Sequence, residues 1–294
     1  MGRYYVIENV DRSWSFEAEE MGSKSKFWYR KPDSKVHWLF KYPHENTGEH
    51  WAEKIAAGAA KLLDIPCAEV RLAVCDGVRG SSSKSFVDDN EELFHGNQVL
   101  AGQLNLYNPE GRFNQKDHTL RNIFLALDRV FGDGGAEKEQ MANYLVLDAV
   151  IGNTDRHHEN WGILVEQRGD HMYGDMAPSF DHATSLGREL PTERRQRLLE
   201  EKRIGRYSER ARGGIFWSEE DAHAVSPLEL VRRGFREFPE SFSNPVRRLR
   251  TLDARRLKAC VSRVPDGWMD PVAKAFSLEL MNYNLSELRK LGHG

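Results

Sequence analysis

Cysteine is scarce in this sequence, which contains only Cys67, Cys75 and Cys260 among 294 residues. The three are scattered, with neither an even number to pair nor the close spacing of metal ligands, so they predict no disulfide framework and no zinc site. Long apolar runs are missing as well, because no stretch reaches transmembrane length and the N-terminus lacks the layout of a signal peptide. We therefore expect a cytoplasmic protein, and a secreted effector is the alternative.

A strong charge of one sign is also absent. The chain has 42 Lys and Arg residues against 45 Asp and Glu residues, for a formal net charge of -3. This near balance provides no general attraction to nucleic acid or to an anionic membrane, so neither is an expected partner. With 39% hydrophobic and 30% charged residues, the composition is that of a globular chain long enough for one large domain or two lobes.

The first hundred residues predict mostly strands and one helix. Two strand-like runs, residues 27–30 and 36–41, are separated by Pro-Asp-Ser and predict a hairpin. A helix is expected to begin at Asn46, whose side chain can cap it with Glu49 three residues later, and to end before Pro66.

A further strand is expected over residues 70–74, where apolar and polar side chains alternate. The serine-rich run 81–85 is interpreted as a loop. Together these elements predict a small α+β lobe over residues 1–95, with the boundary in the polar stretch 85–105.

Beyond about residue 118 the spacing of the apolar residues becomes helical. Residues 120–127 and 141–151 predict two helices, and residues 163–165 and 171–173 predict a short hairpin. The remainder predicts a helical bundle, so we expect residues 96–294 to form a larger helical lobe. The predicted fold class is α+β, with two lobes of unequal size.

The most informative segment is residues 152–160, Gly-Asn-Thr-Asp-Arg-His-His-Glu-Asn. It places Asp155 and Asn160 five positions apart, and Asp181 follows later, directly behind an aromatic residue. In a kinase-type phosphoryl-transfer centre, the first Asp receives the proton of the attacking hydroxyl, and the Asn and the later Asp hold Mg²⁺ ions. The alternative is a polar loop whose Asp and Asn side chains cap turns.

Two histidines, His157 and His158, lie between these groups and could instead indicate a transition-metal site. Adjacent histidines rarely point the same way, and neither a helical histidine pair nor a cysteine accompanies them. Magnesium is therefore the favoured metal.

Lys41 ends the second strand-like run, and Glu53 lies on the expected helix, on a face of small residues. A strand lysine that holds the α- and β-phosphates of ATP, fixed by a helix glutamate, is a standard part of protein kinases. The chain order Lys, Glu, Asp, Asn, Asp is the one that such a site requires. The alternatives are a solvated lysine at a strand end and, on the same helix, Glu49 in place of Glu53.

Residues 22–26, Gly-Ser-Lys-Ser-Lys, predict a small basic turn before the first aromatic strand. Backbone N–H groups of such a turn can cradle phosphates, and the candidate residues are Gly22, Ser23, Lys24 and Ser25. The turn contains one glycine and neither of the established glycine-rich phosphate motifs, so an ordinary hairpin turn is the alternative.

The segment from Arg188 to Arg212 carries nine arginines and lysines against five glutamates. It follows Asp181 at the place where a kinase has its activation and substrate-docking segment. It could receive an acidic or phosphorylated partner through arginine pairs. The alternative is a solvated helix surface with charge pairs at helical spacing.

Together these residues make the chain resemble the HipA-like kinases, a bacterial branch of the protein-kinase-like superfamily. The resemblance rests on residues 151–155 and 177–181, on Asn160, on residues 38–41 and on the helix that contains Glu53. It implies a two-lobed fold and a Ser/Thr protein kinase that uses ATP and Mg²⁺.

The resemblance also implies a role for each matching polar residue. Lys41 contacts the nucleotide phosphates and pairs with Glu53. Asp155 is the catalytic base, and Asn160 and Asp181 are the Mg²⁺ ligands.

Other positions follow from the same resemblance. The segment around Phe86 and Val87 passes the adenine, and His157 takes part near the γ-phosphate. Family members also phosphorylate a serine of their phosphate loop, so Ser23 and Ser25 are candidates for autophosphorylation.

The long HipA-type toxins carry an additional N-terminal region that helps to engage a DNA-binding antitoxin. This sequence begins almost directly at the phosphate loop, so it resembles the short form of the family. An antitoxin or another regulatory protein is a candidate partner, while direct nucleic-acid binding is not expected.

Two alternatives to a protein kinase remain open. Asp155-Arg156-His157 with Asn160 also resembles phosphatidylinositol kinases, which would make the substrate a lipid. A pseudokinase that binds nucleotide and a partner without transferring phosphate is the second, although the five polar positions are filled by competent residue types.

Overall fold

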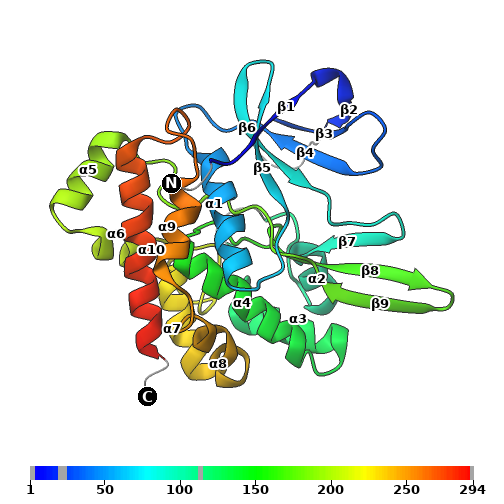
Figure 1. The fold of residues 1–294 in the computed structure, drawn as a ribbon. Coiled ribbons are helices and arrows are strands. Elements are labelled where there is room, and N and C mark those ends of the chain that lie inside the picture. The colour runs from blue at the N-terminus through cyan, green and yellow to red at the C-terminus, as the bar shows by residue number, and fades with distance from the viewer. Residues whose placement is uncertain (1–3, 19–24, 112–114, 292–294) are drawn as a thin grey trace.

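The structure, a computed structural model, describes residues 4–18, 25–111 and 115–291. A strand-rich region packs against a helical region, and α1 (Glu49–Leu62) lies between them (Figure 1). Strands dominate the first part of the chain and helices the second, which confirms the predicted α+β class.

In the described part of the chain, the first sheet has six strands in the order β1-β5-β6-β4-β3-β2. β1 pairs with β5 in parallel, and all other neighbours are antiparallel. The bounds are β1 Ile7–Val10, β2 Ser15–Ala18, β3 Lys26–Arg30, β4 His37–Lys41, β5 Val70–Cys75 and β6 Val78–Lys84. The short 3₁₀ helix Arg12–Trp14 joins β1 to β2.

The predicted hairpin is confirmed by the antiparallel pairing of β3 with β4. Phe27, Trp38 and Phe40 are buried together on one face of this hairpin. Because side chains alternate along a strand, Leu39 and Lys41 lie on the opposite face. That face borders a large cavity.

The helix α1 begins later than the sequence predicted. Its N-cap is Gly48, and Asn46 lies outside the helix with φ 58°, so the predicted Asn46 cap is wrong. The ring of Trp51 lies 1.8 Å from the point where a Cβ of residue 48 would stand. Only glycine leaves room for the folded-back indole at this position.

The serine run expected to form a loop lies instead in β6, so that expectation is wrong. Ser81 and Ser82 are buried where β6 pairs with both β4 and β5. The Tyr29 hydroxyl donates to Ser82 Oγ at 3.1 Å, and Ser81 Oγ donates to Glu53 Oε2 at 3.4 Å. Packing against α1 and neighbouring strands therefore overrides the local preference of serine for turns.

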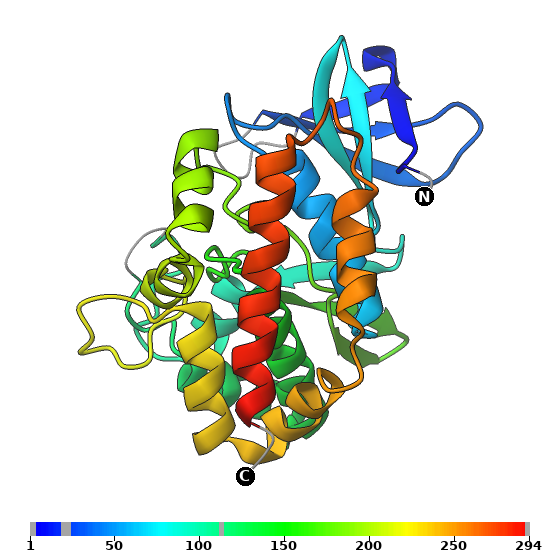
Figure 2. The same ribbon diagram turned by 60° about the vertical axis from the view of Figure 1, so that its left-hand side comes forward.

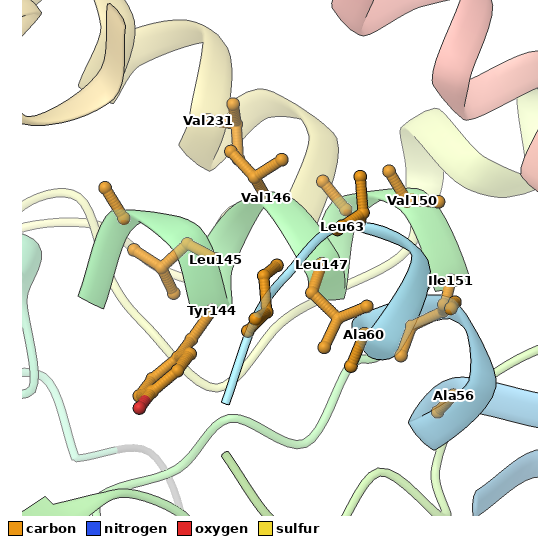
Figure 3. Packing of buried hydrophobic residues seen from close by; sticks show 14 of the residues in the cluster. Ala56, Ala60, Leu63, Tyr144, Leu145, Val146, Leu147, Val150, Ile151 and Val231 are labelled. Carbon is orange, nitrogen blue, oxygen red and sulfur yellow. The ribbon is translucent and has the colours of Figure 1, made fainter. Parts of the chain in front are cut away.

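The core between the two regions is built by α1 and α4 (Gly135–Ile151). Figure 3 shows Ala56 and Ala60 of α1 in the same buried cluster as Leu147 and Ile151 of α4. The small alanine side chains let the two helices approach closely, as close-packed interiors require. Since α1 carries Glu53 and α4 runs into the 152–160 segment, this contact fixes the two relative to each other.

A second sheet, of three strands in the described residues, has the order β7-β8-β9. The bounds are β7 Glu91–His95, β8 Gly162–Arg168 and β9 His171–Met176. The antiparallel pairing of β8 with β9 confirms the second predicted hairpin. The lobe boundary at residue 95 stays a prediction; β7, which ends there, pairs with β8.

The predicted helices around residues 120–127 and 141–151 are confirmed, and α10 runs along the whole helical region (Figure 2). Asn284 of α10 donates to the Val150 carbonyl at 3.3 Å, and Ser277 donates to the Leu186 carbonyl at 3.2 Å. The remaining bounds are α2 Gly96–Gln103, α3 Leu120–Phe131, α5 Thr192–Glu200, α6 Ile204–Arg210, α7 Pro227–Glu237, α8 Pro239–Arg248, α9 Ala254–Ser262 and α10 Pro271–Leu291. Across the described ranges, no helix has both the length and the apolar character of a membrane span.

Candidate active site

A cavity of about 800 Å³ is lined by residues of both regions, a volume typical of a small-molecule site. The first sheet contributes its polar face, and the 152–160 segment and the residues around Asp181 contribute the facing wall. The sequence-predicted residues that line this cavity are Lys41, Phe86, Val87, Asp155, His157, Asn160 and Asp181. Side chains far apart in the sequence therefore meet in one space.

Lys41 lies between two carboxylates. Its Nζ is 3.2 Å from Glu53 Oε1 and 3.4 Å from Asp181 Oδ1. Burial by itself lowers the pKa of a lysine, but Asp181 and Glu53 outweigh this effect and raise the pKa of Lys41 above its usual value. Lys41 therefore stays charged at physiological pH.

Glu53, not Glu49, reaches the lysine. Glu53 is 2% exposed and also accepts the Ser81 hydrogen bond, so its carboxylate is held from two sides. Glu49 faces another way and pairs with Arg188 at 2.6 Å. Of the two glutamates that the sequence left open, only Glu53 forms the ion pair with Lys41.

Asp155 and Asn160 are tied together by the turn between them. The Asn160 side-chain amide donates to the Asp155 carbonyl at 2.7 Å, which leaves its oxygen for another partner. The backbone N–H of Asp155 donates to Asn153 Oδ1 at 3.2 Å, and the Thr184 hydroxyl donates to Asp155 Oδ2 at 3.2 Å. The carboxylate of Asp155 is thus oriented by Thr184, a residue that sequence reasoning missed.

A second charged cluster lies beneath this turn. Arg156 is 3% exposed and forms a two-pronged pair with Asp148, with Nε to Oδ2 at 2.7 Å and Nη2 to Oδ1 at 2.8 Å. It also donates to the Asn160 carbonyl at 2.5 Å and to Ser179 Oγ at 2.9 Å. Burial would lower the pKa of Arg156, but Asp148 more than compensates and raises it. This cluster joins α4, the turn and the segment before Asp181.

The adjacent histidines both border the cavity and differ in burial and in their partners. His157 lines the cavity, with Nε2 at 3.9 Å from Asp155 Oδ1. His158 is 1% exposed, its Nδ1 lies 2.8 Å from the Tyr107 hydroxyl, and burial lowers its pKa. Within the described residues, no three His, Cys, Asp or Glu side chains gather where they could hold a metal ion.

Aromatic residues form one end of the cavity. The rings of Phe86 and Phe180 lie 5.4 Å apart, and His95 meets Phe180 edge-on at 5.9 Å. Leu39 and Val87 line the same cavity. This apolar surface fits a flat aromatic ligand, and it lies beside Asp181, the neighbour of Phe180.

The candidate phosphate loop is described only in part. Gly22, Ser23 and Lys24 lie outside the described residues. Ser25 is exposed, immediately before β3, and its carbonyl accepts the backbone N–H of Tyr42 at 3.0 Å.

The far wall of the cavity comes from a loop that sequence reasoning missed, and its lining residues are Arg212, Gly213, Gly214, Phe216, His223 and Ala224. A Cβ on Gly214 would stand 2.7 Å from the backbone of Arg156 and His157, so this loop rests directly on the 152–160 turn. His118 fastens the contact: its Nδ1 lies 2.8 Å from the Gly214 carbonyl, and its Nε2 accepts from the Trp161 indole at 3.2 Å. The adjacent glycines Gly213 and Gly214 were the feature of the sequence that could have indicated this loop.

The arrangement of a small sheet, a glutamate-bearing helix and a helical region around this cavity defines a protein-kinase-like class. The chain belongs to the family of the HipA-like C-terminal domain, whose model matches residues 18–241, so the predicted family is confirmed. No curated protein matches the sequence.

Several solved structures share the fold, and two of them are described here. The proinflammatory kinase CtkA of Helicobacter pylori has a TM-score of 0.77 and 18% identity, with 94% of each chain covered. The second is a chain in the complex of the Shewanella oneidensis MR-1 toxin–antitoxin system HipA, HipB and its operator DNA. It has a TM-score of 0.60 and 13% identity, with 93% of this chain and 65% of that chain covered. At such identities the likeness shows the fold alone.

Proposed function

We propose that this protein is a MgATP-dependent kinase that phosphorylates a serine or threonine hydroxyl of a protein. The observation that carries the proposal is the position of Lys41 between Glu53 and Asp181, at 3.2 and 3.4 Å, beside the cavity that Asp155 and Asn160 also line. A buried cation flanked by two carboxylates is a strong local charge arrangement that a polyphosphate with its metal can use.

The nucleotide would lie between the aromatic end and the charged end of the cavity. Phe86, Val87 and Leu39 would contact the adenine, and Lys41 would bind the phosphate oxygens. With its raised pKa, Lys41 keeps its charge while it neutralises charge that develops on the transferred phosphoryl group. Lys26, at the edge of the same cavity, would add a second cation near the phosphates.

The acceptor hydroxyl would approach Asp155. Thr184 holds one carboxylate oxygen of Asp155 at 3.2 Å, and Oδ1 lies 3.9 Å from His157 Nε2. Asp155 would orient the hydroxyl and accept its proton as the oxygen attacks, which is catalysis by position and charge. His157 would lie beside the transferred group.

The donor set fits Mg²⁺. The Asn160 amide nitrogen is used by the Asp155 carbonyl, so the amide oxygen is the ligand that this side chain offers. Asp181 adds a carboxylate on the same cavity. Mg²⁺ prefers such hard oxygen ligands, with one or two from protein and the rest from phosphate and water. When bound, the metal would neutralise phosphate charge, while Asn160 and Asp181 set its position.

The test is incubation of the protein, Asp155→Ala and Asp170→Ala with γ-labelled ATP and Mg²⁺, followed by intact and peptide mass spectrometry. Asp170 is exposed on the β8–β9 turn and serves as the matched control. We expect label on protein serine or threonine with the wild type and with Asp170→Ala, and none with Asp155→Ala. Label on Ser23 or Ser25 would identify autophosphorylation of the candidate phosphate loop.

The same experiment separates the alternatives. Phosphoinositide vesicles added as acceptor would become labelled in place of protein if the chain were a lipid kinase. Arg156 belongs to the motif that is shared with lipid kinases. Its guanidinium donates to Asp148, Asn160 and Ser179, so its presence does not favour a lipid substrate. Binding of ATP without label on any acceptor would indicate a pseudokinase, and no binding would overturn the proposal.

A regulatory protein partner is part of the proposal. The Shewanella HipA was solved together with HipB and its operator DNA, and the chain described here covers 65% of the matched chain in that complex. We propose a protein partner without direct DNA contact, since the net charge of -3 gives this chain no general attraction to DNA. Its first test is co-purification with proteins encoded beside its gene.

A further inference from the structure

Glu49 lies one turn before Glu53 on α1 and is bound to the segment that follows Asp181. It is 3% exposed, and its Oε1 accepts Arg188 Nη1 at 2.6 Å. His44 also contacts it, with its backbone N–H at 3.0 Å from Oε2 and its ring at 3.0 Å from Oε1. This buried carboxylate is therefore held in one orientation.

The first turn of α1 is wrapped by the same segment through further contacts. The Gly48 backbone N–H donates to the Arg188 carbonyl at 2.9 Å. Arg195 is 6% exposed, donates to the Gly187 and Arg188 carbonyls at 2.9 and 3.3 Å, and stacks over the Trp51 ring at 5.7 Å. Residues 187–195 thus form a fixed clamp on α1, not a free surface loop.

Arg188 also faces the candidate base. Its Nη2 donates to Thr184 Oγ1 at 3.5 Å, and Thr184 donates to Asp155 Oδ2 at 3.2 Å. Glu49 lies one helical turn before Glu53 on α1. Glu53 pairs with Lys41, and Lys41 also pairs with Asp181. One guanidinium therefore lies between the lysine side and the base side of the cavity.

We propose that Arg188 is a positioning residue that sets both sides of the site at once, without phosphorylation of the segment that carries it. The proposal rests on the proposed function. Through Nη1 and Glu49, Arg188 holds α1 where Glu53 meets Lys41. Through Nη2 and Thr184, it orients the carboxylate of Asp155.

The planar fork of arginine is what this double contact requires, because two separate N–H groups point to two acceptors. A lysine presents one compact charge, so it can serve Glu49 or Thr184 but not both in the same geometry. Two hydroxyls just before the clamp are already used: Thr184 bonds Asp155, and Ser185 is buried and donates to the His182 carbonyl at 2.8 Å. Within the clamp, Thr192 is exposed. The ion pair of Arg188 with Glu49 supplies a contact between α1 and this segment that needs no phosphate.

The experiment compares Arg188→Ala, Arg188→Lys and Glu49→Gln with the control Arg197→Ala, an exposed arginine of α5. It measures hydrogen exchange of residues 49–62 and 182–190, MgATP affinity, and the kcat and KM of transfer to myelin basic protein. For Arg188→Ala we expect faster exchange in both segments, a several-fold higher KM for ATP, and a kcat lower by about 10- to 100-fold. Arg188→Lys is expected to keep the KM for ATP near wild type and to lose kcat.

The difference between Arg188→Lys and Arg188→Ala is the decisive result, because a merely structural role would raise the KM for ATP and lower kcat in both variants, together with a lower melting temperature. If Arg188→Ala and Arg188→Lys both behave like the control Arg197→Ala, the proposal is overturned. If Arg188→Ala fails to fold, Glu49→Gln decides, since it keeps the volume and should raise the KM for ATP. Wild type treated with phosphatase should keep its activity, and a loss overturns the phosphorylation-independent role.

The experiment distinguishes failure of the proposed kinase function from failure of the proposed role of Arg188. If the wild type transfers no phosphate, the exchange and MgATP-binding measurements still test the clamp. Unchanged exchange of residues 49–62 in Arg188→Ala would then overturn it, and faster exchange with weaker MgATP binding would support it.

Discussion

Two clusters of charged side chains lie near the candidate site, one around Lys41 and the other around Arg156, and they differ in what surrounds them. Lys41, Glu53 and Asp181 meet at 3.2 and 3.4 Å beside the cavity. Asp148 and Arg156 meet at 2.7 and 2.8 Å with both side chains 3% exposed, away from the cavity lining. The first cluster is loose and open on one side, and the second is tight and closed.

The difference separates a cluster at the cavity from a cluster enclosed by protein. The open cluster keeps a carboxylate at the cavity surface, where the proposed function places metal and phosphate. The closed cluster has its hydrogen bonds satisfied by protein. Asp155 and Arg156 are neighbours in one motif, but Asp155 lines the cavity whereas Arg156 holds the turn in place.

Arg156→Ala has the largest expected effect and tests the closed cluster. It leaves Asp148 charged, buried and without its partner, which should destabilise the fold by about 3–5 kcal/mol. Urea unfolding measures the change. Replacement of both partners by apolar residues, Asp148→Leu with Arg156→Met, should recover much of the loss, and no recovery would contradict the closed-cluster interpretation.

Lys41→Met tests the open cluster. We expect transfer to fall by at least about 100-fold, because the charge that neutralises the phosphoryl group is removed. The free energy of unfolding should fall less than in Arg156→Ala, since Asp181 is reached by water from the cavity and the buried Glu53 keeps the hydrogen bond from Ser81. Labelled-ATP assays measure the transfer rate, and urea unfolding measures the stability. Equal destabilisation by Lys41→Met and Arg156→Ala would contradict the distinction between the open and the closed cluster.

His118, which is buried and bonds Gly214 and Trp161 next to the 152–160 turn, adds a test by pH. Burial lowers the pKa of His118 from 6.5 to about 3, so the folded protein holds it neutral while the unfolded chain takes up a proton below 6.5. Stability is therefore complete above pH 6.5 and falls as the pH drops toward 3, by up to about 2 kcal/mol at pH 5 from this residue alone. Urea unfolding at pH 7 and pH 5 measures it, and His118→Gln should show a smaller loss.

Ser81→Ala should have the smallest effect. The bond from Ser81 to Glu53 is 3.4 Å long, at the weak end of the range, and Lys41 still holds the same carboxylate. We expect a loss of less than about 1 kcal/mol in stability and little change in the KM for ATP. A tenfold rise in KM would show that Glu53 depends on Ser81 for its orientation.

Much of the architecture was predictable because it is local. The β3–β4 hairpin, α4 and the β8–β9 hairpin follow from apolar periodicity and from turn residues within a short window of sequence. The order of Lys41, Glu53, Asp155, Asn160 and Asp181 was readable too. The structure brings four of these residues to one cavity and buries Glu53 against Lys41. Their roles remain predictions.

The features that the sequence did not predict depend on contacts between residues that are far apart in the chain. Ser81 lies in a central strand because α1 covers it, although serine runs favour turns. The partner of Glu49 is Arg188, which lies 139 residues away, and no local pattern joins them. The N-cap of α1 is Gly48, against which the Trp51 ring packs, and it has no capping side chain that the sequence could show.

The long helix α10 has a consequence for the order of events during synthesis. Asn284 bonds the last turn of α4 and Ser277 bonds Leu186, so the 152–160 turn and the clamp both depend on contacts with α10. A ribosome synthesises α10 after every other element described here. The nascent chain therefore cannot complete the contacts that support the turn and the clamp before α10 has been made.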